Sequence, residues 1–509
     1  MNQVRSSFGI ELEGYIAWVE EGVVFQNPSR YHWNPSAGPI ILPAGSGATK
    51  GVREWQTRTR DLVYVRLTAF IMRILTRNRE HVVVSQGKTK EELKKDGMDH
   101  LEEYRHWKVV PEYLDHEKIP ESLQRSWGGF ERGGQDRGWV PFELCSPALL
   151  ATNASYDEVR NVIRTLNDNL WILTPRNCGL HVHYGNGSNW LPLAPLRRLA
   201  GLMYAADALL VQLHPRRRRT YEYCRSNVMY SQLAHGATAA DAKEDIYNPE
   251  IRYEGAAELL IPVEKPQVEA REEPRSNRPE ESCCWPCNFG HRPVDSPQED
   301  ASINLNIRPG GRRGSLGTYP YPDDFEHNFY ISNKLQAVYH PRNHPPEHRP
   351  SPYMPIPDAV RELLKVNNSV ELDTLFDPQM NERPAYNSQN YGEVRYITDD
   401  QKRTIEFRQG AGVFDGDVVT AWCKIVVGLS EWAAQAPLGE YWKVILDCTV
   451  AAETQHEGTW EDAAWYDAFD LLVDTGLSEE GRVMYQFVKQ EATQRRALRA
   501  ARRRASLSS

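Results

Sequence analysis

The composition of this chain is that of a folded, water-soluble protein with room for a large core. It has 509 residues, 40% hydrophobic and 25% charged, enough for two or more domains. Its formal net charge of −9 argues against a general nucleic-acid binder, although arginines gather at 216–219 and over 495–504. No apolar run approaches the roughly 20 residues that a membrane span requires, and no signal peptide precedes the first strand-like segment. We therefore expect a cytoplasmic protein, whose eight scattered cysteines are reduced.

The first part of the chain predicts strands that alternate with helices. A strand over Phe8–Glu13 is followed by a Pro/Gly-rich loop and by a helix over 54–75. Helical spacing directs one set of its side chains toward a core: Leu62, Val65, Phe70, Ile71 and Ile74. A more polar helix is expected over 91–104 and a strand over 107–111.

A second strand, Phe142–Pro147, leads into a helix. Ser155 and Glu158 match the capping-box pattern for its start. The apolar face of this helix is expected to contain Val159, Val162, Ile163, Leu166 and Leu170.

The rest of the chain repeats the alternation around two unusual stretches. A strand at Gly179–His183 precedes a helix over 193–213, and a strand at 404–409 precedes a helix over 418–432. The composition of 262–300 predicts disorder, and a Pro/His-rich excursion is expected over about 340–357. We interpret 1–478 as one catalytic domain with these two interruptions, and 479–509 as a C-terminal helix with a basic tail.

Four of the predicted strands share one feature, a polar face opposite an apolar face. Side chains alternate along a strand, so the carboxylates, imidazoles and guanidinium of these segments lie apart from their Phe, Ile, Leu and Val residues. One sheet would gather seven such side chains: Glu11, Glu13, Glu143, His181, His183, Glu406 and Arg408. Carboxylates at this range repel one another, so the face requires divalent cations or raised pKa values.

Each motif taken alone has a simpler interpretation. Glu-x-Glu also occurs on exposed edge strands, and His-x-His also forms zinc sites, phosphate contacts or hydrogen-bonded pairs. Glu406 and Arg408 could form a salt bridge, and the arginine run at 216–219 could be a solvated surface. Cys283–Cys287 has no matching second pair at zinc-finger spacing.

The order of the four motifs resembles the fungal-type putative amidoligase family, of the carboxylate-amine ligase group with glutamine synthetase. The residues that carry the resemblance are Phe-Gly-Ile-Glu-Leu-Glu at 8–13, Phe-Glu-Leu-Cys-Ser-Pro at 142–147, Asn-Cys-Gly-Leu-His-Val-His at 177–183 and Arg-Thr-Ile-Glu-Phe-Arg-Gln at 403–409. Supporting similarities lie at 107–112, 213–226 and 385–387, so the resemblance extends over about 8–434.

This resemblance implies an α+β fold, a curved antiparallel sheet with helices on its outer face. It also implies ATP and Mg²⁺ or Mn²⁺, with Glu13 and Glu143 on one metal and Glu11, His181 and Glu406 on the other. His183 and Arg408 would face phosphate, and Arg408, His183 and Glu406 would be catalytic. The implied activity joins a small-molecule or peptide carboxylate to an amine through an acyl phosphate, without a membrane or nucleic-acid partner.

One position departs from the family pattern. Gly410 follows Arg408-Gln409 where the family commonly has histidine, so substrate choice or activity could differ here. A metal-dependent hydrolase that uses the same Glu/His face, and a non-catalytic binding descendant of the fold, remain alternatives. The acid, the amine and the oligomeric state are not specified by the sequence.

Overall fold

A computed structural model describes residues 5–25, 34–44, 61–70, 106–111, 136–175, 177–187, 189–215, 224–247, 354–377, 383–392, 402–457 and 466–507. The chain forms two compact units. Unit 1 comprises Met1–Ser7, His183–Gln409 and Lys424–Ser509, and unit 2 comprises Phe8–Val182 and Gly410–Cys423. Within the described ranges, none of the helices combines the length and the apolar character that crossing a membrane requires.

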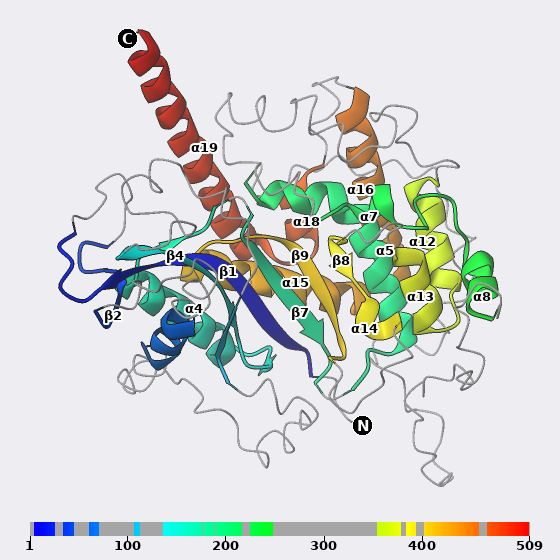
Figure 1. The fold of residues 1–509 in the computed structure, drawn as a ribbon. Helices are drawn as coiled ribbons and strands as arrows, with labels where there is room; N and C mark the ends of the chain where they lie inside the picture. Colours follow the sequence, from blue (N-terminus) through cyan, green and yellow to red (C-terminus); the bar gives the residue numbers. More distant parts are fainter. Residues whose placement is uncertain are drawn as a thin grey trace, which may run out of the picture. The chain divides into compact units, whose positions relative to one another are not determined.

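The strands of the described residues form a nine-stranded sheet. Its main path runs β3-β4-β1-β7-β9-β8, and β2, β5 and β6 pair with β1 (Figure 1). The strands are β1 (Ser7–Glu20), β2 (Ile40–Leu42), β3 (Lys108–Pro111), β4 (Arg137–Cys145), β5 (Leu149–Leu150), β6 (Ile172–Leu173), β7 (Gly179–Gly185), β8 (Tyr386–Asn387) and β9 (Thr404–Ala411). The β1–β4, β1–β6, β3–β4 and β8–β9 pairs are antiparallel, and the β1–β2 pair is parallel.

The helices make this an α+β fold, as predicted. They are α4 (Asn153–Asn169), α5 (Leu193–Leu210), α7 (Asn227–Tyr230), α8 (Ala239–Tyr247), α12 (Ile356–Lys365), α13 (Ser369–Phe376), α14 (Gln389–Gly392), α15 (Gly416–Gln435), α16 (Leu438–Glu457), α18 (Ala468–Asp474) and α19 (Ser478–Leu507). A 3₁₀ turn, Val211–Leu213, extends α5, and a further helical segment spans 61–70. The sheet is neither closed nor strongly curled, so it is flatter than the family resemblance implied.

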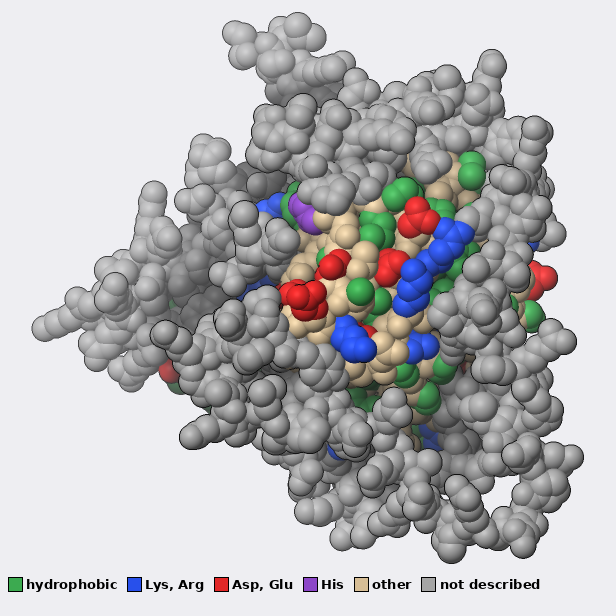
Figure 2. Space-filling view, turned by 90° about the vertical axis from the view of Figure 1, so that its right-hand side faces the viewer, with side chains coloured by type: hydrophobic (Ala, Val, Ile, Leu, Met, Phe, Trp, Pro, Cys, Tyr) green, Lys and Arg blue, Asp and Glu red, His purple; other side chains and the backbone are tan. Residues whose placement is uncertain are grey.

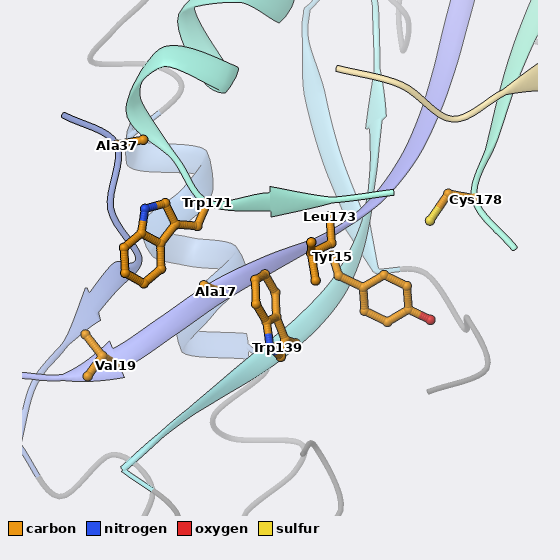
Figure 3. Packing of buried hydrophobic residues seen from close by; sticks show 8 residues of the cluster. All are labelled: Tyr15, Ala17, Val19, Ala37, Trp139, Trp171, Leu173 and Cys178. Carbon is orange, nitrogen blue, oxygen red and sulfur yellow. The ribbon is translucent and has the colours of Figure 1, made fainter. Parts of the chain in front are cut away.

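The core of unit 2 includes an aromatic cluster on one face of β1 (Figure 3). Tyr15, Ala17 and Val19 alternate along β1, and the buried indoles of Trp139 and Trp171 pack with them. These β1 residues share their strand face with Glu11 and Glu13 because all have odd numbers. One face of a single strand therefore changes from carboxylates to packed aromatics within a few residues.

In unit 1, helix α5 packs against α12 and α16, and α8 packs against α13. Figure 2 views the side on which α8, α12 and α13 lie in Figure 1, and acidic and basic side chains both occur there. On α12, Arg361 pairs with Asp358 and Lys365 pairs with Glu362, each at three-residue spacing. Exposed pairs of this kind contribute little to stability, so the apolar contacts around α5 hold these helices together.

Most of the predicted elements are confirmed, although several are longer in the structure. Strands β1, β4, β7 and β9 contain the four motifs, and α4, α5 with its 3₁₀ turn, α15 and α19 match predicted helices. The expected apolar face of α4 is buried, with Leu170 just after its last turn. The helix expected over 91–104 and the disorder expected over 262–300 lie outside the described residues, as does all but the end of the excursion over 340–357.

The predicted start of α4 is wrong. Thr152 is the N-cap, because its hydroxyl accepts a hydrogen bond from the backbone N–H of Ser155 at 3.2 Å. Glu158 is buried and accepts a hydrogen bond from the indole of Trp107 at 2.9 Å. Its carboxylate therefore binds an indole N–H from outside the helix, and the capping-box assignment does not hold.

The predicted buried face of the helix over 54–75 is wrong at Val65, and Ile71 and Ile74 lie outside the described residues. Val65 is 65% exposed, whereas Val63 and Leu67 are fully buried. The hydroxyl of Tyr64 donates a hydrogen bond to the carbonyl of Pro141 at 2.6 Å, which orients the helix toward strand β4. The spacing of the apolar residues alone did not distinguish the predicted face from the observed buried face, which is displaced by one or two residues around the helix.

These two valines provide a matched test of the observed face. Val63→Ala should lower the free energy of unfolding by about 2 kcal/mol, because it removes buried apolar surface and leaves a cavity. Val65→Ala should change it by less than about 0.5 kcal/mol. Urea denaturation of both variants measures the difference, and a larger loss for Val65→Ala would contradict the observed orientation.

Candidate active site

In unit 2, three of the predicted site residues meet on β1 and β7. His181 Nδ1 lies 3.6 Å from a carboxylate oxygen of Glu11, and its Nε2 lies 3.8 Å from one of Glu13. The His181 side chain is only 4% exposed, and the Glu13 side chain 11%. The imidazole thus lies between two carboxylates that the alternation of β1 directs to the same side.

Glu143 adds a third carboxylate to this group through strand register. Antiparallel pairing places Glu143 directly opposite Glu13, and the thiol of Cys145 donates a hydrogen bond to Glu143 at 3.1 Å. Side chains at directly opposite positions have Cβ atoms about 5 Å apart, so two ionised carboxylates there repel each other. The pair therefore suits a divalent cation.

The segment before His181 supports this arrangement with three consecutive residues. Asn177 donates a side-chain hydrogen bond to the hydroxyl of Tyr15 at 3.0 Å, and Cys178 packs in the aromatic cluster (Figure 3). The backbone N–H of Gly179 donates to Glu13 at 2.6 Å. A charge-assisted hydrogen bond of this kind stabilises an ionised carboxylate away from water. The Asn-Cys-Gly motif therefore orients Glu13 from within the protein.

In unit 1, the three remaining site residues lie on β7 and β9. The Arg408 guanidinium forms a buried ion pair with one oxygen of Glu406, and the side-chain amide of Asn387 donates to the other oxygen at 2.9 Å. His183 Nδ1 lies 3.2 Å from the hydroxyl of Thr404. Ligand atoms of His183 and Glu406 lie within 4.8 Å of each other, close enough for one cation to bind both.

The donor set fits the metals that the resemblance implies. Carboxylate oxygens are the preferred ligands of Mg²⁺, and Mn²⁺ also accepts imidazole. The structure brings together Glu11, Glu13, Glu143 and His181 in unit 2, and His183, Glu406 and Arg408 in unit 1. The salt bridge between Glu406 and Arg408, an alternative open from the sequence, forms along one strand at two-residue spacing.

Two glycines that follow the histidines have roles inside unit 1. A Cβ on Gly185 would lie 3.1 Å from both Ser7 Oγ and Thr404 Cγ2. Gly187 has a positive φ of 55°, and its N–H donates to the Ser7 hydroxyl at 3.0 Å. Both glycines therefore allow the backbone to approach other parts of the chain closely.

Sequence reasoning missed the fully buried carboxylate of Asp207. It lies on α5 and accepts hydrogen bonds from the hydroxyl of Ser226 and, at 2.6 Å, from the side-chain amide of Gln409. The signal was present, since Asp207 is the one charged residue in the apolar stretch 199–211. A charge at such a position needs buried partners.

Burial raises the pKa of Asp207 from 3.8 to about 7, while the hydrogen bonds from Ser226 and Gln409 oppose the shift. Burial also raises the pKa of the Tyr386 phenol well above 10, and the charge of Asp207 adds to that shift. Asp207 is therefore a carboxyl group whose protonation in the folded protein changes near neutral pH.

Gly410 has a packing explanation within unit 2. A Cβ at this position would lie 2.4 Å from the carbonyl oxygen of Leu180 and 3.0 Å from both Leu180 Cβ and Trp422 Nε1. Backbone atoms cannot yield as a flexible side chain does. The family histidine would therefore collide with β7 and α15 in this protein.

We predict that Gly410→Ala lowers the free energy of unfolding by about 1–3 kcal/mol, because the added methyl group overpacks the β7–β9 contact. Gly38→Ala is the matched control, since a Cβ on Gly38 meets no atom within 4 Å. Thermal unfolding of both variants tests this. Equal unfolding temperatures would show that position 410 has room for a side chain.

The raised pKa of Asp207 predicts a pH dependence of stability. The folded state binds a proton between pH 3.8 and about pH 7 that the unfolded state has lost, so stability falls as pH rises through this interval. From pH 5 to pH 8, wild type should lose about 2.5 kcal/mol more than Asp207→Asn, which cannot ionise. Urea unfolding at both pH values measures this, and parallel losses would contradict it.

Comparison with known proteins agrees with part of this site. The family model described as "Putative amidoligase enzyme" matches residues 66–253, which include Glu143, His181 and His183 but not the first or fourth motif. No curated protein and no solved structure matches the chain. Residues 66–253 are thus similar to the putative amidoligase enzyme family, the family that the order of the motifs resembles.

Proposed function

We propose that this protein is an ATP-dependent carboxylate-amine ligase that forms an amide or isopeptide bond. The observation that carries the proposal is the group formed by the buried Glu13 and His181 and the partly buried Glu143, two of whose members lie in the region that matches the amidoligase family. A catalytic fold like that of glutamine synthetase, with helices on the outer face of the sheet, is part of this proposal.

Two divalent cations, Mg²⁺ or Mn²⁺, fit the predicted donors. Glu13 and Glu143 would hold one, and Glu11, His181 and Glu406 the other, as the resemblance implies. His183 is a further candidate ligand, because its ring lies close to the Glu406 carboxylate. When bound, the cations would neutralise negative charge on the phosphates of ATP.

The chain's own residues would orient and stabilise the reacting groups. Arg408 presents a planar set of donors that matches two phosphate oxygens, and its pairing with Glu406 keeps it in a defined direction. Asn387 holds the second oxygen of Glu406, which limits rotation of that carboxylate. His183 would donate to phosphate from a position where Thr404 constrains its ring.

The chemistry requires no covalent enzyme intermediate. An oxygen of the substrate carboxylate attacks the γ-phosphorus of ATP, the bond to the ADP oxygen breaks, and an acyl phosphate forms. The amine then attacks the acyl carbon, loses a proton and displaces phosphate. Charge accumulates on the transferred phosphoryl group, where Arg408 and the cations are most effective.

The test is a screen of acids and amines in which ADP release is measured with Mg²⁺ or Mn²⁺. Wild type should release ADP only when the matching acid and amine are both present. Glu13→Gln and Glu406→Gln should each reduce the rate at least about 100-fold, because each removes a negative charge from a metal ligand. Glu244→Gln, the same change at an exposed position on α8, should leave the rate unchanged.

Full activity in both site variants would overturn the assignment of these residues. Bond cleavage without nucleotide, together with no ATP binding in a calorimetric titration, would identify the protein as a metal-dependent hydrolase instead.

A further inference from the structure

A second polar group in unit 1 surrounds Asp207, and no step of the proposed reaction uses it. Asp207 is fully buried on α5, an otherwise apolar helix in this stretch. Its Oδ2 accepts from Ser226 and its Oδ1 from Gln409, so each carboxylate oxygen binds a different segment of the chain.

The first of these segments holds strand β8. Ser226 precedes Asn227, whose side chain accepts from the Tyr386 N–H at 3.1 Å and donates to the Tyr386 carbonyl at 3.4 Å. The Arg225 carbonyl accepts from the Ala385 N–H at 2.7 Å. The residue after Tyr386 is Asn387, which donates to Glu406. One oxygen of Asp207 is thus connected to the partner of Glu406.

The second segment is strand β9 itself. Gln409 is the neighbour of Arg408, and successive side chains of a strand point to opposite faces. A fixed Gln409 side chain therefore fixes the direction of the Arg408 side chain. The residue just before β8 contributes again, because the Arg408 N–H donates to the Ala385 carbonyl at 2.8 Å.

We propose that Asp207 is a positioning residue that sets Glu406 and Arg408, through Ser226 and β8 on one side and through Gln409 on the other. This inference rests on the proposed function, since it concerns how the metal- and phosphate-binding side chains are aimed. A buried carboxylate is costly to desolvate, and an apolar residue of similar size would pack more favourably. The carboxylate offers two acceptor oxygens that order two segments at once, which no apolar side chain can do.

Three changes separate positioning from stability. Asp207→Leu has a side chain of similar shape but no acceptor oxygen, so the donors Ser226 and Gln409 both lose their partner. Gln409→Met removes the amide and retains the volume, so only the connection to β9 is lost. The double change Asp207→Asn with Gln409→Glu reverses the polarity of the pair, because the amide introduced at position 207 would donate to the carboxylate introduced at position 409, and restores both hydrogen bonds.

Tyr441→Phe is the stability control. It removes one buried hydrogen bond of unit 1, from the Tyr441 hydroxyl to the Arg198 carbonyl at 2.9 Å, in the contact between α5 and α16. Its cost should be about 1 kcal/mol. A residue that only stabilises the fold should behave like Tyr441: a lower unfolding temperature and unchanged binding.

The measurement is the dissociation constant of Mn²⁺ in the presence of the non-hydrolysable nucleotide AMP-PNP, by electron paramagnetic resonance, below the unfolding temperature of every variant. Asp207→Leu and Gln409→Met should each weaken binding about 10–100-fold, the range seen when the hydrogen-bond partners of ligating side chains are removed. The double variant should recover at least half of that loss on a logarithmic scale, and Tyr441→Phe should bind like wild type.

The outcomes also separate this inference from the proposed function. Wild-type protein that binds neither Mn²⁺ nor AMP-PNP overturns the proposed function and with it this inference. Wild-type binding with unchanged affinity in both single variants overturns the positioning role alone. If Asp207→Leu does not fold, Gln409→Met decides the question, because it retains Asp207 with its hydrogen bond from Ser226.

Discussion

The central constraint in unit 2 is that a carboxylate kept from water needs donors, cations or a proton. Glu13 meets this requirement with the Gly179 N–H and the His181 ring, yet strand register also places Glu143 opposite it. The aromatic cluster farther along β1 makes the constraint stricter, because its packed indoles bury that part of the face (Figure 3). The fold therefore brings carboxylates together at this site, which favours the binding of a cation.

Unit 1 also contains buried carboxylates, which bind side chains on both faces of strand β9. Arg408 and Gln409 are adjacent on β9, and each binds a buried carboxylate: Glu406 for the first and Asp207 for the second. Strand β9 thereby carries the Glu406–Arg408 ion pair, which is proposed to act in the reaction. Through Gln409, the same strand is hydrogen-bonded to Asp207 on helix α5. Because side chains alternate along a strand, the adjacent residues Arg408 and Gln409 point to opposite faces of β9, and their two contacts remain separate.

The sequence was sufficient for the four strands and most of the helices, because their two-residue and 3.6-residue periods are local properties. The polar faces around Glu13, His181 and Glu406 followed from the same rule. The incorrect predictions concerned residues whose partners lie far along the chain. Val65 is exposed because the helix buries Val63 and directs the Tyr64 hydroxyl to the Pro141 carbonyl of β4. Glu158 binds Trp107 instead of its own helix end. Asp207 was overlooked because only tertiary structure places Ser226 and Gln409 beside it. The packing at Gly410 required coordinates for Leu180 and Trp422.

The hydrogen bond from Gly179 to Glu13 has a consequence for how such a site is mapped. Its donor belongs to the main chain, so replacing residues one at a time with alanine leaves the donor in place at every position of the segment. A mutational scan would rank Asn177 and Cys178 by their side chains and register nothing of this contact. Only proline at position 179, or an ester in place of that peptide bond, removes the N–H, and backbone chemistry is thus the means to weigh this part of the site.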